Sequence, residues 1–188
     1  MKAGTIIKTF KSQKGREVTI RAIKSGDVDG LLSFGNSLIA EDTTVLLSGE
    51  PLTREYEETY VKETLKKMEK DQKIHLVAII DNVIAGSLEL RRGERRKSHT
   101  ADVGISILKE YRDEGIGQEC LRTLIEEAKN LGLKLLTLTC FETNDRAIRL
   151  YESLGFKKCG LIPETLFYKE QYENEVIMHL PLSNSSDI

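Results

Sequence analysis

The sequence contains no tryptophan, and its 188 residues include only three prolines, three cysteines and three histidines. The cysteines are few and widely spaced, which argues against a disulfide framework, and no Cys/His pair has zinc-ligand spacing, so we expect no metal. No apolar run approaches the ~20 residues of a membrane span. The N-terminus lacks the apolar core of a signal peptide. The net charge of −2 gives no general attraction to nucleic acid or an acidic membrane. We therefore expect a cytoplasmic protein with neither kind of partner.

The length predicts a single domain over residues 1–188, with its core at about 16–182. Residues 1–15 are polar and basic, so we expect a loose arm or an extra strand there. Residues 183–188 are a polar tail that we expect to be loose. The cysteines lie in apolar surroundings, which predicts buried thiols at Cys120, Cys140 and Cys159.

Hydrophobic periodicity predicts two helices followed by strands, then alternating strands and helices. The expected helices are 25–39, 53–70, 118–131 and 144–154, and the expected strands are 18–23, 74–80, 83–90, 101–108, 134–141, 157–162 and 175–180. In the second helix Tyr56, Tyr60, Val61, Leu65 and Met68 form one stripe, and the Lys/Glu-rich face opposite is expected to be solvated. The order predicts an α/β protein with a mixed sheet and helices on both faces.

The segment 112–117, Arg-Asp-Glu-Gly-Ile-Gly, lies between an expected strand and an expected helix. Glycine lets the backbone approach a ligand closely and adopt positive φ. The free N–H groups of the first helical turn favour an anion. We therefore interpret this segment, the cradle, as a binding site for a pyrophosphate.

Three kinds of phosphate-binding loop compete for this interpretation. A P-loop requires Gly-Lys-Ser/Thr, but Gln118 and Glu119 follow Gly117. A dinucleotide fingerprint requires a third glycine, where Cys120 stands, although Glu142 could serve as the ribose-binding acid. The third kind, Arg/Gln-x-x-Gly-x-Gly/Ala, is matched in full.

A second motif lies downstream, in residues 144–156, with the pattern Asn-x-x-Ala-x-x-Leu-Tyr-x-x-x-Gly-Phe. Together the two motifs resemble the GNAT superfamily of N-acetyltransferases. The resemblance covers about 16–182 and is sharp over 99–160. It implies acetyl-CoA as co-substrate and a mostly antiparallel central sheet that splays open beside the cradle, with the pantetheine arm in the split.

The resemblance also implies which residues contact acetyl-CoA. Backbone N–H groups from Arg112 to Gln118 would reach the phosphates, Arg112 would add a positive charge, and the backbone of 105–107 would bond the pantetheine amides. Asn144 is an expected helix N-cap whose side chain would also contact the cofactor. The full set is Ile105, Ser106, Ile107, Arg112, Asp113, Glu114, Gly115, Ile116, Gly117, Gln118, Asn144, Ala147 and Tyr151.

Acetyl transfer to an amine needs an acid for the leaving thiolate and a base for the amine. By resemblance Tyr151 is the acid, although it could equally be a core aromatic residue. Asp102 is the expected base and Glu89 is its rival. Asp102 could instead form a surface ion pair with Arg91 or Arg95.

The acceptor is expected to be a small-molecule or peptide amine: a polyamine, a protein N-terminus or a small amino compound. The segment 164–173 resembles the substrate-side loop of GNAT proteins, and the two N-terminal helices would form the opposite wall. A non-catalytic acyl-CoA-binding regulatory module is the alternative function. We also expect a homodimer whose edge is the last strand, with Val176, Ile177 and Met178.

Overall fold

The computed structural model describes residues 1–182, which build one eight-stranded sheet in the order β1-β2-β3-β4-β5-β6-β8-β7. Neighbouring strands are antiparallel except for β5 and β6, which are parallel. The strands are β1 (Ile6–Lys11), β2 (Glu17–Ala22), β3 (Lys73–Ile80), β4 (Val83–Arg92), β5 (Thr100–Ile107), β6 (Leu135–Phe141), β7 (Lys157–Tyr168) and β8 (Gln171–Pro181). The expected mixed, mostly antiparallel sheet is confirmed.

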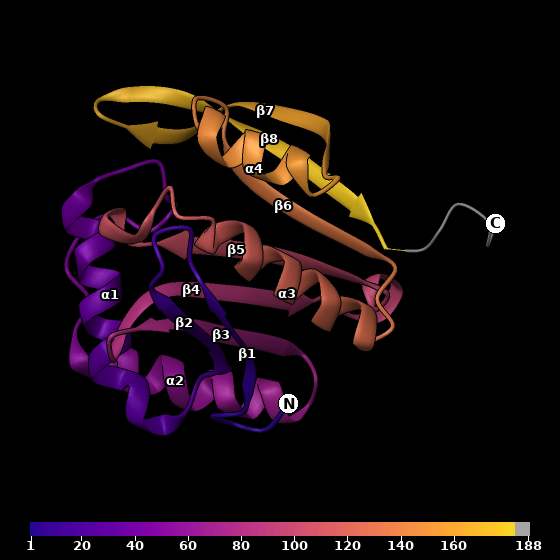
Figure 1. The fold of residues 1–188 in the computed structure, drawn as a ribbon. Coiled ribbons are helices and arrows are strands. Elements are labelled where there is room, and N and C mark those ends of the chain that lie inside the picture. Colours follow the sequence, from indigo (N-terminus) through magenta and orange to yellow (C-terminus); the bar gives the residue numbers. More distant parts are fainter. Residues whose placement is uncertain (183–188) are drawn as a thin grey trace.

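Helices cover both faces of the sheet, as expected. The α-helices are α1 (Val28–Glu41), α2 (Arg54–Glu69), α3 (Ile116–Asn130) and α4 (Asp145–Ser153), and short 3₁₀ turns span η1 (Ser25–Asp27), η2 (Arg95–Lys97) and η3 (Lys109–Tyr111). In Figure 1, α3 and α4 lie in front of the sheet and α2 lies behind it. The helix α1 packs against α2 and β4, so these two N-terminal helices share one face.

The sheet splits between β5 and β6. The two strands pair only from Thr100 with Leu135 to Asp102 with Thr137. Beyond that point they diverge, and Figure 1 shows the gap widening toward the ends of both strands. The backbone groups of 103–107 that face β6 therefore have no strand partner there. The splayed sheet implied by the family resemblance is present.

The N-terminal segment contains an ordered strand, the second of the two expected forms. Strand β1 pairs antiparallel with β2 over 6–11 and 17–21, so a loose arm is the wrong description for that part. The predicted loose tail at 183–188 lies outside the described residues.

The last strand is not an edge of the sheet, contrary to the expectation for a dimer. Strand β8 lies between β6 and β7 and pairs with both. Val176 and Met178 are buried, at 2% and 0% exposure. The edge is β7, because the chain returns from it by a hairpin into the position beside β6. The homodimer stays a prediction, without the support that we expected from β8.

The buried stripe of α2 also differs from the expectation. Glu57, Val61, Thr64 and Met68 are its buried residues, whereas Tyr56 is 57% exposed. The helix is rotated so that one glutamate of its supposedly solvated face lies inside.

Two of the three expected buried thiols are buried. Cys120 and Cys140 lie in the core, but Cys159 is exposed on the edge strand β7. Little packs against this edge strand, so the Cys159 side chain is exposed to solvent although its neighbours in the sequence are apolar.

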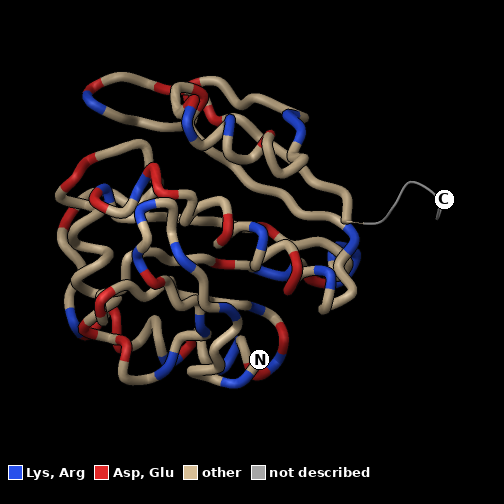
Figure 2. The backbone as a smooth tube through the Cα atoms, in the orientation of Figure 1, with Lys and Arg blue, Asp and Glu red and all other residues tan. Residues whose placement is uncertain are grey.

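Lysine and arginine alternate with aspartate and glutamate over the whole backbone, and neither sign dominates one side in the view of Figure 2. This interspersion agrees with the small net charge of −2. Among the described residues, no helix is long and apolar enough to cross a membrane. Nor do residues 1–182 hold a group of three or more His, Cys, Asp or Glu side chains that could bind a metal ion.

Candidate active site

The cradle joins the end of β5, through η3, to the start of α3. Gly115 has φ of 76° and is the N-cap of α3, so the chain turns into the helix at a residue that tolerates left-handed backbone. Asp113 also has positive φ, 59°, which aspartate accepts better than most residues. The helix begins at Ile116, slightly before its expected start. Its first N–H groups and its dipole make this end attractive to an anion.

A cavity of about 490 Å³, the cradle cavity, opens beside the first turn of α3 and the split in the sheet. Eleven of the thirteen residues expected to bind the cofactor line it, and only Glu114 and Ile116 do not. Lining residues beyond the expectation come from the α1–α2 loop and from α4: Thr43, Thr44, Val45, Arg146, Arg149 and Leu150.

The side chains of Glu114 and Ile116 point away from the cavity. Both are 1% exposed. The hydroxyl of Ser12 donates to Glu114 Oε2 at 2.9 Å, and Lys14 and Arg16 lie 3.3 and 3.4 Å from its Oε1. These two residues therefore fix the cradle from behind, and only their backbone groups could reach a phosphate.

Arg112 lines the cavity, but its charge is already paired. Its guanidinium forms a two-pronged ion pair with Glu41 at the end of α1, with 2.7 Å between Arg112 Nη2 and Glu41 Oε2. Its Nε donates to the carbonyl of Ile107 at 2.8 Å. The side chain thus ties the cradle to α1. The sequence predicts that it presents a free positive charge to the phosphates, but that charge is paired with Glu41.

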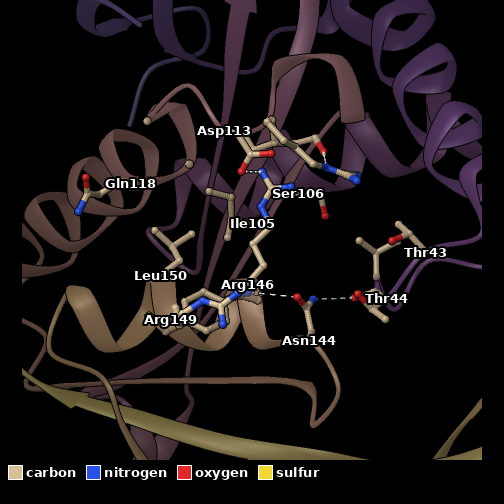
Figure 3. A pocket seen from close by; sticks show the side chains of 17 residues that line it. Thr43, Thr44, Ile105, Ser106, Asp113, Gln118, Asn144, Arg146, Arg149 and Leu150 are labelled. Carbon is tan, nitrogen blue, oxygen red and sulfur yellow. Dashed lines mark hydrogen bonds and ion pairs between the residues drawn. The ribbon is translucent and has the colours of Figure 1, made fainter. Parts of the chain in front are cut away.

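The cations that face the cavity come instead from α4. Figure 3 shows Arg146 reaching from α4 toward Asp113 on the opposite wall, where Nη2 and Oδ1 are 3.1 Å apart. Arg149 lines the same cavity and forms no ion pair with residues in the described range. Arg149 is therefore the cation best able to receive a phosphate.

Asn144 caps α4, as expected. Its Oδ1 accepts from the backbone N–H of Ala147 at 3.1 Å. Its Nδ2 donates to the carbonyl of Thr44 at 3.2 Å, so the same side chain holds the α1–α2 loop against α4 (Figure 3).

A second cavity, of about 520 Å³, continues from the first one. We call it the α1–α2 cavity, because these two helices and their loop form its walls and strands β3, β4, β5 and β6 form its floor. Five residues of the expected cofactor set line both cavities: Ile105, Ser106, Asn144, Ala147 and Tyr151. The two cavities are therefore adjoining halves of one cleft that meet at the split in the sheet.

Tyr151 lies at this junction and is 7% exposed. Burial, with a further contribution from Cys140, raises the pKa of its phenol above the ordinary value. Its ring packs against Phe156, with 6.0 Å between the centroids. The phenol is thus protonated at neutral pH and positioned by the core.

A network of polar side chains forms the floor of the α1–α2 cavity around Glu89. Lys73 Nζ lies 3.0 Å from Glu89 Oε1, Arg91 Nη1 lies 2.8 Å from Oε2, and the Tyr60 hydroxyl donates to the same carboxylate. Burial opposes ionisation, but His75, Lys73 and the Tyr60 hydrogen bond outweigh it, and the pKa of Glu89 falls to about 2. The Glu89 carboxylate is therefore firmly ionised.

His75 lies in the same floor and is neutral at physiological pH. Burial lowers its pKa to about 4. Its Nε2 and the Ser87 hydroxyl are 2.8 Å apart, and its Nδ1 lies 3.2 Å from the Tyr60 hydroxyl. The ring is a hydrogen-bonding member of the floor rather than a charge.

Asp102 lines neither cavity. Its Oδ1 lies 2.5 Å from Arg91 Nη2, and its side chain is 42% exposed. This is the surface ion pair that the sequence left open as the alternative to a catalytic role. The rival, Glu89, does line the α1–α2 cavity.

The segment 164–173 is the tip of the β7–β8 hairpin, and none of its residues lines either cavity. Phe167 and Tyr172 are 67% and 69% exposed and pack on each other with ring centroids 5.3 Å apart. The Tyr168 hydroxyl donates to the carbonyl of Asp42 at 2.9 Å. The segment therefore contacts the α1–α2 loop instead of the cleft.

Comparison with known protein families shows to which family the chain belongs. The model of the acetyltransferase (GNAT) family matches residues 41–156, more than half of the chain. The chain belongs to the GNAT family. It is an acyltransferase, since the relatives that it matches are acetyltransferases.

Three similar proteins illustrate the spread of the family. The putative phosphinothricin acetyltransferase of Bacillus subtilis is 27% identical over 150 residues, 78% of this chain and 88% of that protein. The L-amino acid N-acetyltransferase of Escherichia coli is 36% identical over 84 residues, which are 44% of this chain and 52% of that protein. A GNAT-family structure from Streptococcus pneumoniae has a TM-score of 0.79 at 28% identity, covering 87% and 99% of the two chains.

Several residues of this GNAT cleft escaped the sequence reasoning. Arg146 and Arg149 stand three residues apart, so one face of α4 presents both, and that spacing was a readable signal. Glu57, four residues before buried Val61, was readable in the same way. The loop residues 43–45 gave no signal of this kind.

Proposed function

We propose that this GNAT protein transfers the acetyl group of acetyl-CoA directly to a primary amine, with Tyr151 as the acid. The observation that carries the proposal is the position of Tyr151 where the cradle cavity and the α1–α2 cavity meet. The cradle cavity would take the cofactor and the α1–α2 cavity the amine. The two reactants would then meet at the phenol.

The cradle fits the pyrophosphate of acetyl-CoA. The first turn of α3 offers free N–H groups, Gly117 leaves room for a close backbone approach, and Arg149 supplies a positive charge. The β6-facing edge of 103–106, which no strand pairs, fits the amides of an extended pantetheine arm, whereas the Ile107 carbonyl already accepts from Arg112 Nε. Bound there, the thioester would supply an activated acetyl group.

Tyr151 would protonate the thiolate that leaves. A phenol that is protonated at neutral pH has a proton to give, and burial keeps it so. A free phenol, with a pKa of about 10, is less acidic than a thiol, at about 8.5, and burial raises the pKa of Tyr151 further, so the proton transfer is uphill and depends on the phenol being positioned at the leaving sulfur. Proton donation by a positioned group typically contributes roughly 10²–10⁴-fold to rate.

Neither of the two expected carboxylates is proposed as the general base. Glu89 is better placed than Asp102, because only Glu89 lines the α1–α2 cavity. A carboxylate with a pKa of about 2, however, is a weak proton acceptor. We propose that Glu89 orients the polar floor and that water carries the amine proton away.

The relatives are named for acetylating an L-amino acid, phosphinothricin and a ribosomal protein alanine, so they leave the acceptor amine of this chain open. The alternative of a non-catalytic acyl-CoA-binding module is not favoured, since the matched relatives are enzymes. A homodimer and a cytoplasmic location stay predictions.

Replacing Tyr151 by phenylalanine tests the proposal. The change keeps the ring and removes one hydroxyl, so the free energy of unfolding should change by no more than ~1 kcal/mol. Steady-state kinetics with acetyl-CoA and an amine panel should show kcat reduced by roughly 10²–10⁴-fold. Coenzyme A should still raise the melting temperature, because the cradle is untouched. Near-normal turnover in this variant would remove Tyr151 from the mechanism.

A further inference from the structure

Among residues 1–182, one carboxylate in the α1–α2 cavity has no hydrogen-bond or ion-pair partner. Glu57 lies on the buried stripe of α2, is 4% exposed and lines the cavity. Burial is the main cause that raises its pKa, with Glu89 adding to the rise and Lys73 opposing it, and no hydrogen bond from residues 1–182 contributes. The Glu57 residue is nearly enclosed while its carboxylate opens to the cavity, so the donor that such a group normally has would come from water or a ligand there.

The two cations near Glu57 are held by other carboxylates. Lys73 is committed to Glu89, at 3.0 Å. Arg91 is committed twice, to Glu89 at 2.8 Å and to Asp102 at 2.5 Å. Asp102 lines neither cavity and is 42% exposed, so it shares Arg91 from outside, and His75 adds no charge near neutral pH because its pKa is about 4. Neither nearby cation is therefore left for Glu57.

The remaining walls of the cavity are largely apolar. Helix α1 and the α1–α2 loop contribute Leu31, Phe34, Leu38, Leu46, Leu47 and Leu52. Within the part of the chain that the structure describes, Arg91 is the only cation that lines the cavity, and two carboxylates already hold it. An acceptor that carried its own carboxylate would find no free cation here and would be repelled by Glu57.

We propose that Glu57 receives the acceptor in its ammonium form, which loses a proton to water before the nitrogen attacks the thioester, and that the acceptor is an amine with an apolar body and no carboxylate. The proposal rests on the proposed function, since it assigns the amine side of that cleft. An ammonium at Glu57 supplies the partner that this carboxylate lacks, and the leucine and phenylalanine side chains cover the apolar body. A free aralkylamine and the apolar N-terminus of a peptide share this chemistry.

Three probes with the same ring separate these sources: phenethylamine, phenylalaninamide and phenylalanine. The kcat/KM for phenethylamine should exceed that for phenylalanine at least about tenfold, because only phenylalanine carries the repelled carboxylate. A preference for phenylalaninamide over phenethylamine would indicate a peptide N-terminus as the source. Phenylalanine as the best of the three would overturn the proposal.

Glu57→Gln removes the charge and keeps the shape, and Glu58→Gln is its matched control. Glu58 is the next residue of α2, pairs with Arg54 at 3.3 Å and is 55% exposed. Glu57→Gln should raise the KM for phenethylamine at least about tenfold, and Glu58→Gln should leave it unchanged. Calorimetric titration of phenethylamine into each variant saturated with coenzyme A should show the same ranking without turnover. An unchanged affinity in Glu57→Gln would overturn the proposal.

Stability and pH provide readouts that a purely structural Glu57 would not give. The glutamine variant should melt no lower than the wild type at pH 7, since it removes an unpaired buried charge. A melting point lower by several degrees would make Glu57 a structural partner and refute the inference. Affinity for phenethylamine should fall as pH is lowered through the raised pKa of Glu57, and this dependence should be absent in Glu57→Gln. The other titratable groups that line the cavity are Tyr56, Tyr60, His75, Glu89, Arg91, Cys140 and Tyr151, and Lys73 lies behind them against Glu89.

Failure of this inference is distinguishable from failure of the proposed function. If coenzyme A does not raise the melting temperature of the wild type, the cleft assignment itself is wrong. If coenzyme A binds and Glu57→Gln behaves like Glu58→Gln, only the role of Glu57 is wrong.

Discussion

Alanine at Gly117 should weaken coenzyme A binding without weakening the fold. An added Cβ at this position would lie 3.5 Å from Leu150 Cδ2 and 3.9 Å from Ile107 Cγ1, which are ordinary contacts. Gly117 is in the first turn of α3, where alanine is favoured over glycine by roughly 0.5–1 kcal/mol at most. For a chain of this size that corresponds to a rise in melting temperature of up to about 4 °C.

The same methyl group would occupy the space that a phosphate needs for close approach to the cradle backbone. Losing one charge-assisted hydrogen bond from a backbone N–H costs about 1.5–3 kcal/mol. Since each 1.4 kcal/mol is tenfold, the Kd for coenzyme A should rise about 10- to 100-fold. Isothermal titration calorimetry measures this change directly, and differential scanning calorimetry measures the melting temperature.

Two other glycines serve as controls, because they need the left-handed backbone. Gly115 has φ of 76° and Gln13 Nε2 within 3.1 Å of an added Cβ, whereas Gly132 has φ of 70° and nothing within 4 Å. Alanine at either should cost roughly 1–2 kcal/mol of backbone strain, or about 2–8 °C. Only Gly115 lies in the cradle, so Gly132→Ala should keep the affinity for coenzyme A. Wild-type affinity in Gly117→Ala, or a melting point lowered as far as in Gly132→Ala, would refute the spatial role of Gly117.

Arg149→Gln should raise the Kd for coenzyme A about tenfold, most clearly at low salt, since it removes a charge that faces the phosphates. Arg112→Gln should instead lower the melting temperature, measured calorimetrically, because it leaves Glu41 without its partner. If Arg112→Gln weakened coenzyme A binding and Arg149→Gln lowered the melting temperature, Arg112 would be the phosphate-binding cation and Arg149 the structural one. Asp102→Asn should change kcat/KM by no more than about fivefold, the equivalent of the ~1 kcal/mol of a surface ion pair, and a loss of a hundredfold would restore Asp102 as the base.

The elements and the cradle could be predicted because their signals are local. The 3.6-residue periodicity placed α3 and α4, alternation and apolar runs placed the strands, and Gly115 and Gly117 marked the turn into α3. The phosphate-side residues follow from the same short segments, so eleven of the thirteen expected contacts line the cradle cavity. The two exceptions sit in the cradle itself, where neighbouring side chains alternate between the ligand and the core.

Pairings between distant segments could not be read in this way. Arg112 meets Glu41 from 71 residues away, and Glu114 meets Ser12 from 102 residues away. Neither partner carries a periodic or compositional mark, because an ion pair depends only on where the fold brings two side chains. The sequence also did not predict that β8 lies between β6 and β7, because a hairpin can place its second strand on either side of its first.

The burial of Glu57 shows how the charged composition of the α2 sequence can mislead at one position. A glutamate among lysines and glutamates of α2 is usually solvated, yet it stands one helical turn before buried Val61. Its pKa is raised in the folded protein, so the stability that Glu57 contributes is fully present below its unfolded pKa and is lost as pH rises through the folded pKa. At neutral pH the residue therefore costs stability, and packing alone does not account for a charge at this position. A ligand that brings its own positive charge removes that cost, which makes the acceptor the physical reason for a carboxylate in the α1–α2 cavity.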